Sequence, residues 1–86
     1  MKLVFCPSCG DIFSLRINVH MACSCEKSWG WYLDESKATI GGDSIPIGIN
    51  NTSFKQALQS RPKSGKGSPF EAFVIPLNCP TVEQEQ

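Results

Sequence analysis

Short runs of β-branched and aromatic residues alternate with polar turn residues along the first third of the chain. These runs cover residues 3–5, 12–17, 19–22 and 29–33. Further apolar runs lie at 38–40 and 44–49, and Pro46 and Gly48 favour a sheet edge or a bulge for the second of them. Phe70–Leu77 has the β-branched and aromatic content of a strand well inside a sheet. The pattern predicts a mainly β fold.

One segment has a helical pattern. Ser53 and Gln56 match a capping box, in which the side chains of both residues satisfy free backbone N–H groups at a helix start. We therefore predict a helix of about two turns from Phe54 to Ser60. Three apolar residues share one face of it and are expected to be buried: Phe54, Ala57 and Leu58. The predicted fold class is mainly β with one short helix.

The length and composition favour one small domain that needs additional stabilisation. The chain has 86 residues, of which 41% are hydrophobic, and a core of this size is often supplemented by a metal or by disulfides. We expect a single domain over residues 1–80 and a flexible tail over residues 81–86. The five cysteines are an odd number and no run of signal-peptide or membrane-spanning length is visible, which favours a reducing, cytoplasmic location.

Four of the cysteines have the spacing of a metal site. Cys6 and Cys9 are separated by two residues, a spacing that lets both sulfurs reach one ion, and Gly10 suits the chain reversal that follows. The thirteen residues before Cys23 are enough for a hairpin that returns Cys23 and Cys25 to the same ion. Two coincidental thiol pairs, a redox pair at Cys6 and Cys9, and an iron site are the alternatives.

Residues 3–34 resemble the zinc ribbon family, in which two knuckles at the tips of adjacent hairpins hold one zinc ion. The first knuckle, Cys6-Pro-Ser-Cys9-Gly10, matches the family pattern. The second departs from it, because one residue separates Cys23 from Cys25 and Glu26 stands where a glycine commonly follows. The resemblance implies one zinc ion per chain. Four thiolates leave no open coordination position, so this zinc would be structural.

Two further residues have metal-ligand chemistry but a weaker case. Cys79 lies far from the other cysteines in sequence, and we interpret it as a small buried hydrophobic residue. His20 lies between the two cysteine pairs and would be a ligand only if it replaced one of four available thiols.

The charges are unevenly distributed although the formal net charge is zero. Residues 55–66 carry four basic side chains and no acidic one: Lys55, Arg61, Lys63 and Lys66. The zero sum argues against a general nucleic-acid coat, since binding through counterion release needs surplus cations. Residues 63–68 combine glycines, hydroxyls and ammonium groups, as phosphate-binding loops do, but lack the Walker spacing. This loop is interpreted as a solvated connector or as an anion site.

We infer a binding protein rather than an enzyme, because the chain has one histidine and no recognisable nucleophile motif. The leading hypothesis is a structural zinc module with a surface for a protein partner or for self-association, for example through an edge strand at Ile45–Ile49. The alternative is a binder of a nucleotide-like anion or nucleic acid. That binder would use the basic residues of 55–68 together with stacking on Trp29 or Trp31.

Overall fold

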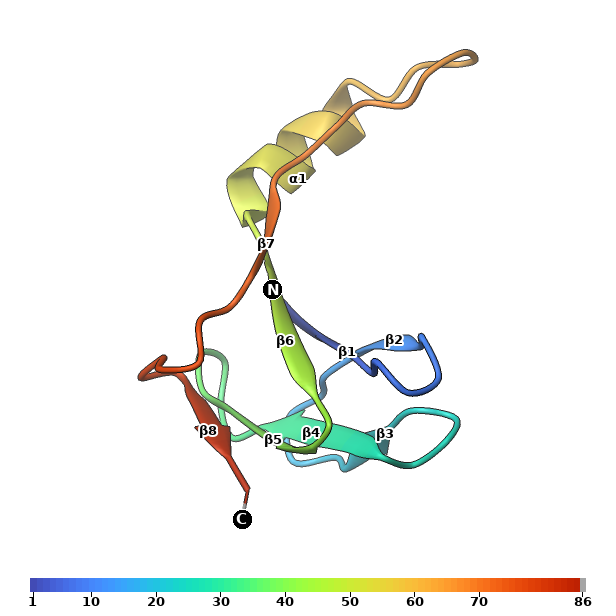
Figure 1. The fold of residues 1–86 in the computed structure, drawn as a ribbon. Coiled ribbons are helices and arrows are strands. Elements are labelled where there is room, and N and C mark those ends of the chain that lie inside the picture. Colours follow the sequence, from blue (N-terminus) through green and yellow to red (C-terminus); the bar gives the residue numbers. More distant parts are fainter. Residues whose placement is uncertain (86) are drawn as a thin grey trace.

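A computed structural model describes residues 1–85 (Figure 1). Within this range eight strands and one helix are present, which confirms the predicted mainly β fold with one short helix. The first sheet has the strand order β2 (Ile12–Ser14), β1 (Lys2–Phe5), β6 (Ile45–Ile49) and β7 (Ala72–Val74). The second has the order β3 (Met21–Ala22), β4 (Ser28–Tyr32), β5 (Ala38–Gly42) and β8 (Val82–Gln84). Neighbouring strands are antiparallel, except that β8 runs parallel to β5.

The core lies between the two sheets and is small. It is built from Val4, Leu15, Ala38, Ile40, Ile75 and Val82. Val4 of the first sheet and Ile40 of the second are both completely buried. Because this core contains few large side chains, a further link between the sheets would contribute substantially to stability.

Strand β6 lies inside its sheet, so the prediction of a sheet edge at Ile45–Ile49 is wrong. It pairs with β1 on one side and with β7 on the other. Pro46 is tolerated there because its carbonyl accepts a hydrogen bond from the Ile75 amide (2.9 Å), one residue beyond the end of β7. The N–H and C=O of a strand residue point to the same side. The N–H that Pro46 lacks would therefore face β7, at a position where the pairing with β7 has already ended.

The segment Phe70–Leu77 was expected well inside a sheet, and this prediction is also wrong. Only Ala72–Val74 form a strand, β7, which lies at the edge of its sheet with all three residues exposed. The Phe73 ring lies over Gly48 of β6, where a Cβ atom would collide with it. Residues 72–74 have strand propensity but, within the described chain, no partner surface that covers their side chains, whereas Ile75 reaches the core.

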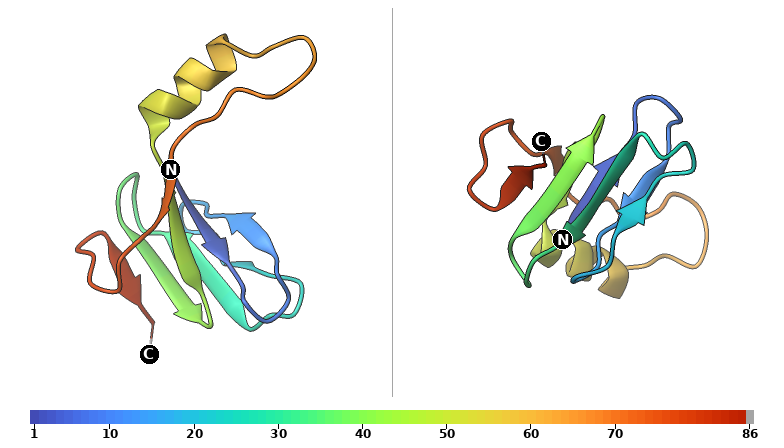
Figure 2. Two further views of the ribbon diagram at one scale, coloured as in Figure 1. Left: turned by 45° about the horizontal axis from the view of Figure 1, so that its top comes forward. Right: turned by 90° about the horizontal axis from the view of Figure 1, so that it is seen from below.

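We call residues 50–71, which connect β6 to β7, the arm. The arm projects away from both sheets and carries the helix α1 (Asn51–Gln59) (Figures 1 and 2). The principal extents of the molecule are accordingly unequal, at 44 × 26 × 22 Å. No helix within residues 1–85 is long and apolar enough to cross a membrane.

Helix α1 begins three residues earlier than predicted. Asn50 is the N-cap, and its side-chain oxygen accepts a hydrogen bond from the Ser53 amide (3.0 Å). The expected burial of the apolar stripe is wrong: none of the nine residues of α1 is buried, and Leu58 is 56% exposed. The apolar face of the helix is therefore only partly covered by the rest of the described chain.

The C-terminal segment is a strand over one half of the length where a flexible tail was predicted. Residues Val82–Gln84 form β8, and Val82 belongs to the core. The Glu85 amide donates to the Ile40 carbonyl (2.7 Å). Gln86, the last residue of the predicted tail, lies outside the described residues. Burial of Val82 and backbone pairing with β5 thus place this polar segment in the second sheet.

Replacement of Val82 measures how much β8 contributes. We expect Val82→Ala to lower the free energy of unfolding by about 2 kcal/mol, because it leaves a cavity in a small core. The control is Val74→Ala, where the side chain is 69% exposed and the change should stay within about 0.5 kcal/mol. Urea denaturation of both variants at one zinc concentration provides the comparison. Equal stabilities would mean that β8 is detached in solution.

Candidate metal centre and the arm

Two hairpin turns bring four cysteines together at one end of the sheets. Cys6 and Cys9 lie in the turn between β1 and β2, and Cys23 and Cys25 lie between β3 and β4. All four sulfur atoms lie within 4.8 Å of one another. Because β1–β2 belongs to the first sheet and β3–β4 to the second, the cluster joins the two sheets.

The spacing of the sulfur atoms fits a tetrahedral ion. The Sγ of Cys25 is 3.6 Å from that of Cys6 and 3.5 Å from that of Cys23. Four sulfurs at the usual zinc–sulfur distance would be about 3.8 Å apart. These separations are far longer than a disulfide bond, and all five cysteines are free thiols. The cluster is therefore consistent with a zinc site.

The cluster lies half inside the protein. Cys6 and Cys23 are buried, whereas Cys9 and Cys25 are exposed. The turn conformations place these side chains: Gly10 has a φ of 76°, as predicted for the chain reversal, and Glu26 has a φ of 63°. A non-glycine residue in this region is unusual, and it lies at the position where the zinc ribbon pattern has a glycine.

Hydrogen-bond donors surround the two sulfurs of the first knuckle. The Ser28 hydroxyl and then the amides of Cys9 and Ser8 lower the pKa of Cys6 to about 6, against an opposing effect of burial. The Asp11 amide is the largest cause of a lowered pKa at Cys9. This arrangement of donors around the sulfurs favours the thiolate form that binds a metal.

Cys25 shows why the cluster needs a cation. The Lys27 amide lowers the pKa of Cys25, but burial and the neighbouring thiols of Cys23, Cys6 and Cys9 outweigh it and raise the pKa to about 12. Four thiolates at these distances repel one another strongly. A divalent cation at their centre would remove this penalty, so the donor set fits a bound metal ion.

Ser28 is a buried polar residue that the sequence did not identify. Its hydroxyl is completely buried and has no hydrogen-bond partner among the described residues. The hydroxyl is nevertheless close enough to the Cys6 sulfur to lower the pKa of Cys6, so this sulfur is its candidate acceptor. A thiolate is a better acceptor than a neutral thiol, so this otherwise costly burial is explained if Cys6 is a metal-bound thiolate.

The side chains of Asp11 and Ser24 connect the two knuckles directly. The carboxylate of Asp11 accepts hydrogen bonds from the amide (3.1 Å) and the hydroxyl (3.3 Å) of Ser24. The same hydroxyl lies 3.8 Å from the sulfur of Cys9. These contacts hold the exposed side of the cluster in place.

The two other candidate ligands lie outside the cluster. His20 lies beside Trp31, with ring centroids 5.8 Å apart. Cys79 is half-buried and packs against the core, and its sulfur lies 3.3 Å from the hydroxyl of Thr81. The Thr81 hydroxyl is the largest cause that lowers the pKa of Cys79.

The predicted anion-binding residues do not form one cluster. The four basic residues, Lys55, Arg61, Lys63 and Lys66, all lie on the arm, whereas Trp29 and Trp31 lie on β4 in the second sheet (Figure 1). Trp29 packs over Gly41 and donates from Nε1 to Glu85 (3.1 Å). Trp29 therefore has a packing role, and the arm carries its cations without a nearby tryptophan.

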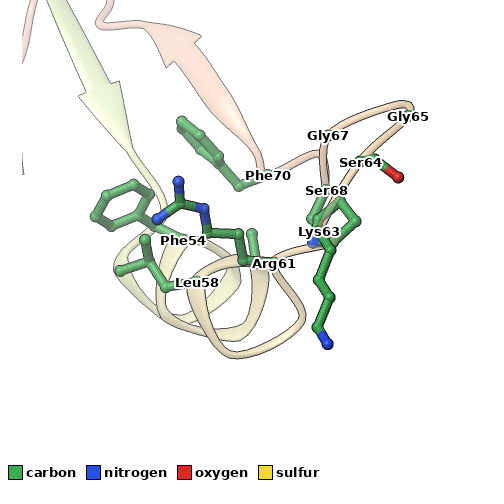
Figure 3. A pocket seen from close by; sticks show the side chains of 11 residues that line it. Phe54, Leu58, Arg61, Lys63, Ser64, Gly65, Gly67, Ser68 and Phe70 are labelled. Carbon is green, nitrogen blue, oxygen red and sulfur yellow. The ribbon is translucent and has the colours of Figure 1, made fainter.

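The arm contains a groove that the sequence did not predict. Its volume is about 330 Å³, and it lies between α1 and the returning segment, residues 61–70 (Figure 3). Phe54 and Leu58 line it from the helix and Phe70 from the other side. In Figure 3 the Arg61 side chain is directed toward the two phenylalanine rings, and Lys63 points away from them. The signal in the sequence was the apolar stripe of the helix, which we had assigned to the core.

Removal of the Ser28 hydroxyl tests its role at Cys6. We expect Ser28→Ala to weaken zinc binding roughly tenfold, since hydrogen bonds to metal ligands typically have this effect. The same change should not lower the free energy of unfolding of the metal-free protein, because the hydroxyl that it removes is buried without a hydrogen-bond partner in the described part of the chain. The matched control is Ser44→Ala, since the Ser44 hydroxyl donates to the Gly41 carbonyl (2.6 Å) and accepts from the Trp29 amide (3.2 Å), with no sulfur among its partners in the described residues. That variant should lose stability and keep its zinc affinity.

Zinc affinity should rise with pH. Because the pKa of Cys25 is about 12, this thiol is protonated at neutral pH and must release its proton when a metal binds. We therefore expect the apparent affinity to increase at least about tenfold per unit between about pH 7 and 9. Below a pH of about 6 it should fall more steeply, because Cys6 also becomes protonated. Competition with a chromophoric chelator measures this slope, and a flat profile would contradict thiolate ligation.

No family model matches the chain, and no curated protein or solved structure matches it significantly. The four-cysteine cluster and the groove of the arm are therefore defined by their own geometry.

Proposed function

We propose that the protein is a non-enzymatic binding module of zinc-ribbon type, in which one structural zinc ion stabilises a small scaffold that presents the arm to a partner. Cys6, Cys9, Cys23 and Cys25 would be the ligands. Four thiolates fill a tetrahedral shell and leave no position for a substrate or a water, so the metal would have no catalytic role. Sulfur ligation and the separation of the sulfur atoms support zinc over harder cations.

The observation that carries the binding role is the exposed apolar surface on and beside the arm. Leu58 and Phe70 are 56% and 43% exposed, and Phe73 and Val74 of the adjoining strand are 54% and 69% exposed. Neighbouring apolar side chains of this kind commonly mark an interaction surface. We infer that a protein partner or a second copy of the chain covers them.

The alternative, binding of an anion or a nucleic acid, has support from the four cations of residues 55–66. It has less support from the aromatic residues, since Trp29 packs against Gly41 and Trp31 lies beside His20. It also leaves the apolar groove without a role. A contact surface for proteins accounts for both the cations and the apolar residues.

Two substitutions separate the role of the metal from the role of the arm. Cys9→Ser should remove a ligand, reduce zinc content below one ion per chain and destabilise the fold. Leu58→Gln should keep the zinc and the fold but lose association with the partner or second copy. Elemental analysis, circular dichroism and light scattering of protein purified from its own cell would measure these outcomes.

The control for Leu58→Gln is Leu33→Gln, which changes a leucine that is 44% exposed between β4 and β5. This variant should associate as the original chain does. A strictly monomeric protein that captures no partner, with or without Leu58→Gln, would contradict the binding role. Full stability of the original chain in a strong chelator would contradict the structural metal.

A further inference from the structure

The groove of the arm has two apolar walls. Phe54 of α1 and Phe70 of the returning segment meet edge to face, with ring centroids 4.9 Å apart and an interplanar angle of 73°. Leu58 extends the helical wall by one turn (Figure 3). Because Leu58 and Phe70 remain about half exposed, the groove can still gain free energy by covering them.

The walls are fixed to each other before any partner binds. At the base of the arm the Asn50 amide donates to the Glu71 carbonyl (3.0 Å), and the Glu71 amide donates to the hydroxyl of Ser53 (2.9 Å). Farther along, the hydroxyl of Ser68 donates to the Ser60 carbonyl (2.8 Å). Such a preorganised groove loses little conformational entropy when it binds.

The charge on the arm defines the chemistry of the occupant. Arg61 and Lys63 line the groove itself, and Lys55 and Lys66 lie nearby in sequence. No acidic residue occurs between Asp43 and Glu71. A complementary occupant therefore carries both apolar side chains for the walls and negative charge for the rim.

Other occupants satisfy only part of this description. A second arm would place its own four cations against these four, and like charges at an interface are unfavourable. The phosphates of a nucleic acid would pair with the cations but would gain nothing from contact with the apolar side chain of Leu58. A bilayer surface takes up apolar side chains from a projecting face, whereas here they line a concave groove.

We propose that the groove binds an acidic protein segment that inserts apolar side chains between α1 and residues 61–70 and places carboxylates beside Arg61 and Lys63. An amphipathic helix with apolar residues on one face and acidic residues beside them fits this description. The inference rests on the proposed role of the arm as a contact surface and specifies the class of partner.

The test uses the full zinc-loaded chain and labelled synthetic peptides. The first peptide carries leucines at i, i+3, i+4 and i+7 with glutamates between them. In the second peptide lysines replace the glutamates, and in the third serines replace the leucines. Fluorescence anisotropy should show binding of the first peptide only, with an affinity that decreases as salt is added.

Charge reversal on the arm provides the matched comparison. Arg61→Glu combined with Lys63→Glu should weaken binding of the acidic peptide at least about tenfold. Arg16→Glu combined with Lys37→Glu makes the same change of charge at exposed positions outside the arm and should alter the affinity less than about twofold. Leu58→Gln should also weaken binding roughly tenfold, because it removes part of an apolar wall. Circular dichroism should show that all these variants fold.

Several results would overturn the proposal. These are failure of the acidic peptide to bind, equal binding of the lysine peptide, equal weakening by both charge variants, or preferential binding to single-stranded oligothymidine or to phosphatidylglycerol vesicles. Association of two chains through the arm at the same concentration would also overturn it. If Leu58→Gln still abolished association with a partner while the acidic peptide failed, the arm would remain a contact surface and only the acidic partner class would be wrong.

Discussion

The meeting of four cysteine sulfurs between two sheets is the constraint on which the rest of the structure depends. Each sheet contributes one hairpin and one pair of thiols, so an ion at the cluster would link the sheets at the end where the hairpins turn. Within residues 1–85, the core offers six buried side chains to hold the sheets together. An ion at this position would therefore hold the β1–β2 hairpin beside the β3–β4 hairpin.

The hairpins and the metal cluster could be predicted because their signals are local. Two short spacings between cysteines and the turn residue Gly10 determine which atoms can meet. The hairpin expected between Cys9 and Cys23 is not formed, because β2 and β3 lie in different sheets. The predicted start of the helix was three residues too late, since Asn50 and Ser53 are both good capping residues and Asn50 is the N-cap. The Ser53 hydroxyl is engaged instead by the Glu71 amide, a contact from a distant part of the chain.

The wrong predictions concern tertiary contacts, which the strand or helix propensity of a segment does not specify. Apolar content indicated a strand at Phe70–Leu77 and a buried stripe on the helix, but whether a surface covers them is decided by the tertiary structure. Pro46 indicated a sheet edge, but β6 is an inner strand. The N–H that Pro46 lacks faces the position where the neighbouring strand β7 has ended. Ser28 carried no sequence signal, because its importance comes only from its burial beside Cys6.

The route of the chain through the arm has a consequence for how this molecule can vary. Ile49 and Ala72, the residues at its two ends, are cross-strand partners in the β6–β7 ladder. The arm is therefore an expanded hairpin loop, and its ends remain together whatever lies between them. The arm and the cysteine cluster lie at opposite ends of β1. Met1, just before β1, donates from its amino group to Asn51 of the arm (3.0 Å), whereas Cys6 directly follows β1. A different loop between Ile49 and Ala72 would leave both sheet register and metal ligands intact, so the scaffold is suited to the exchange of one recognition element for another.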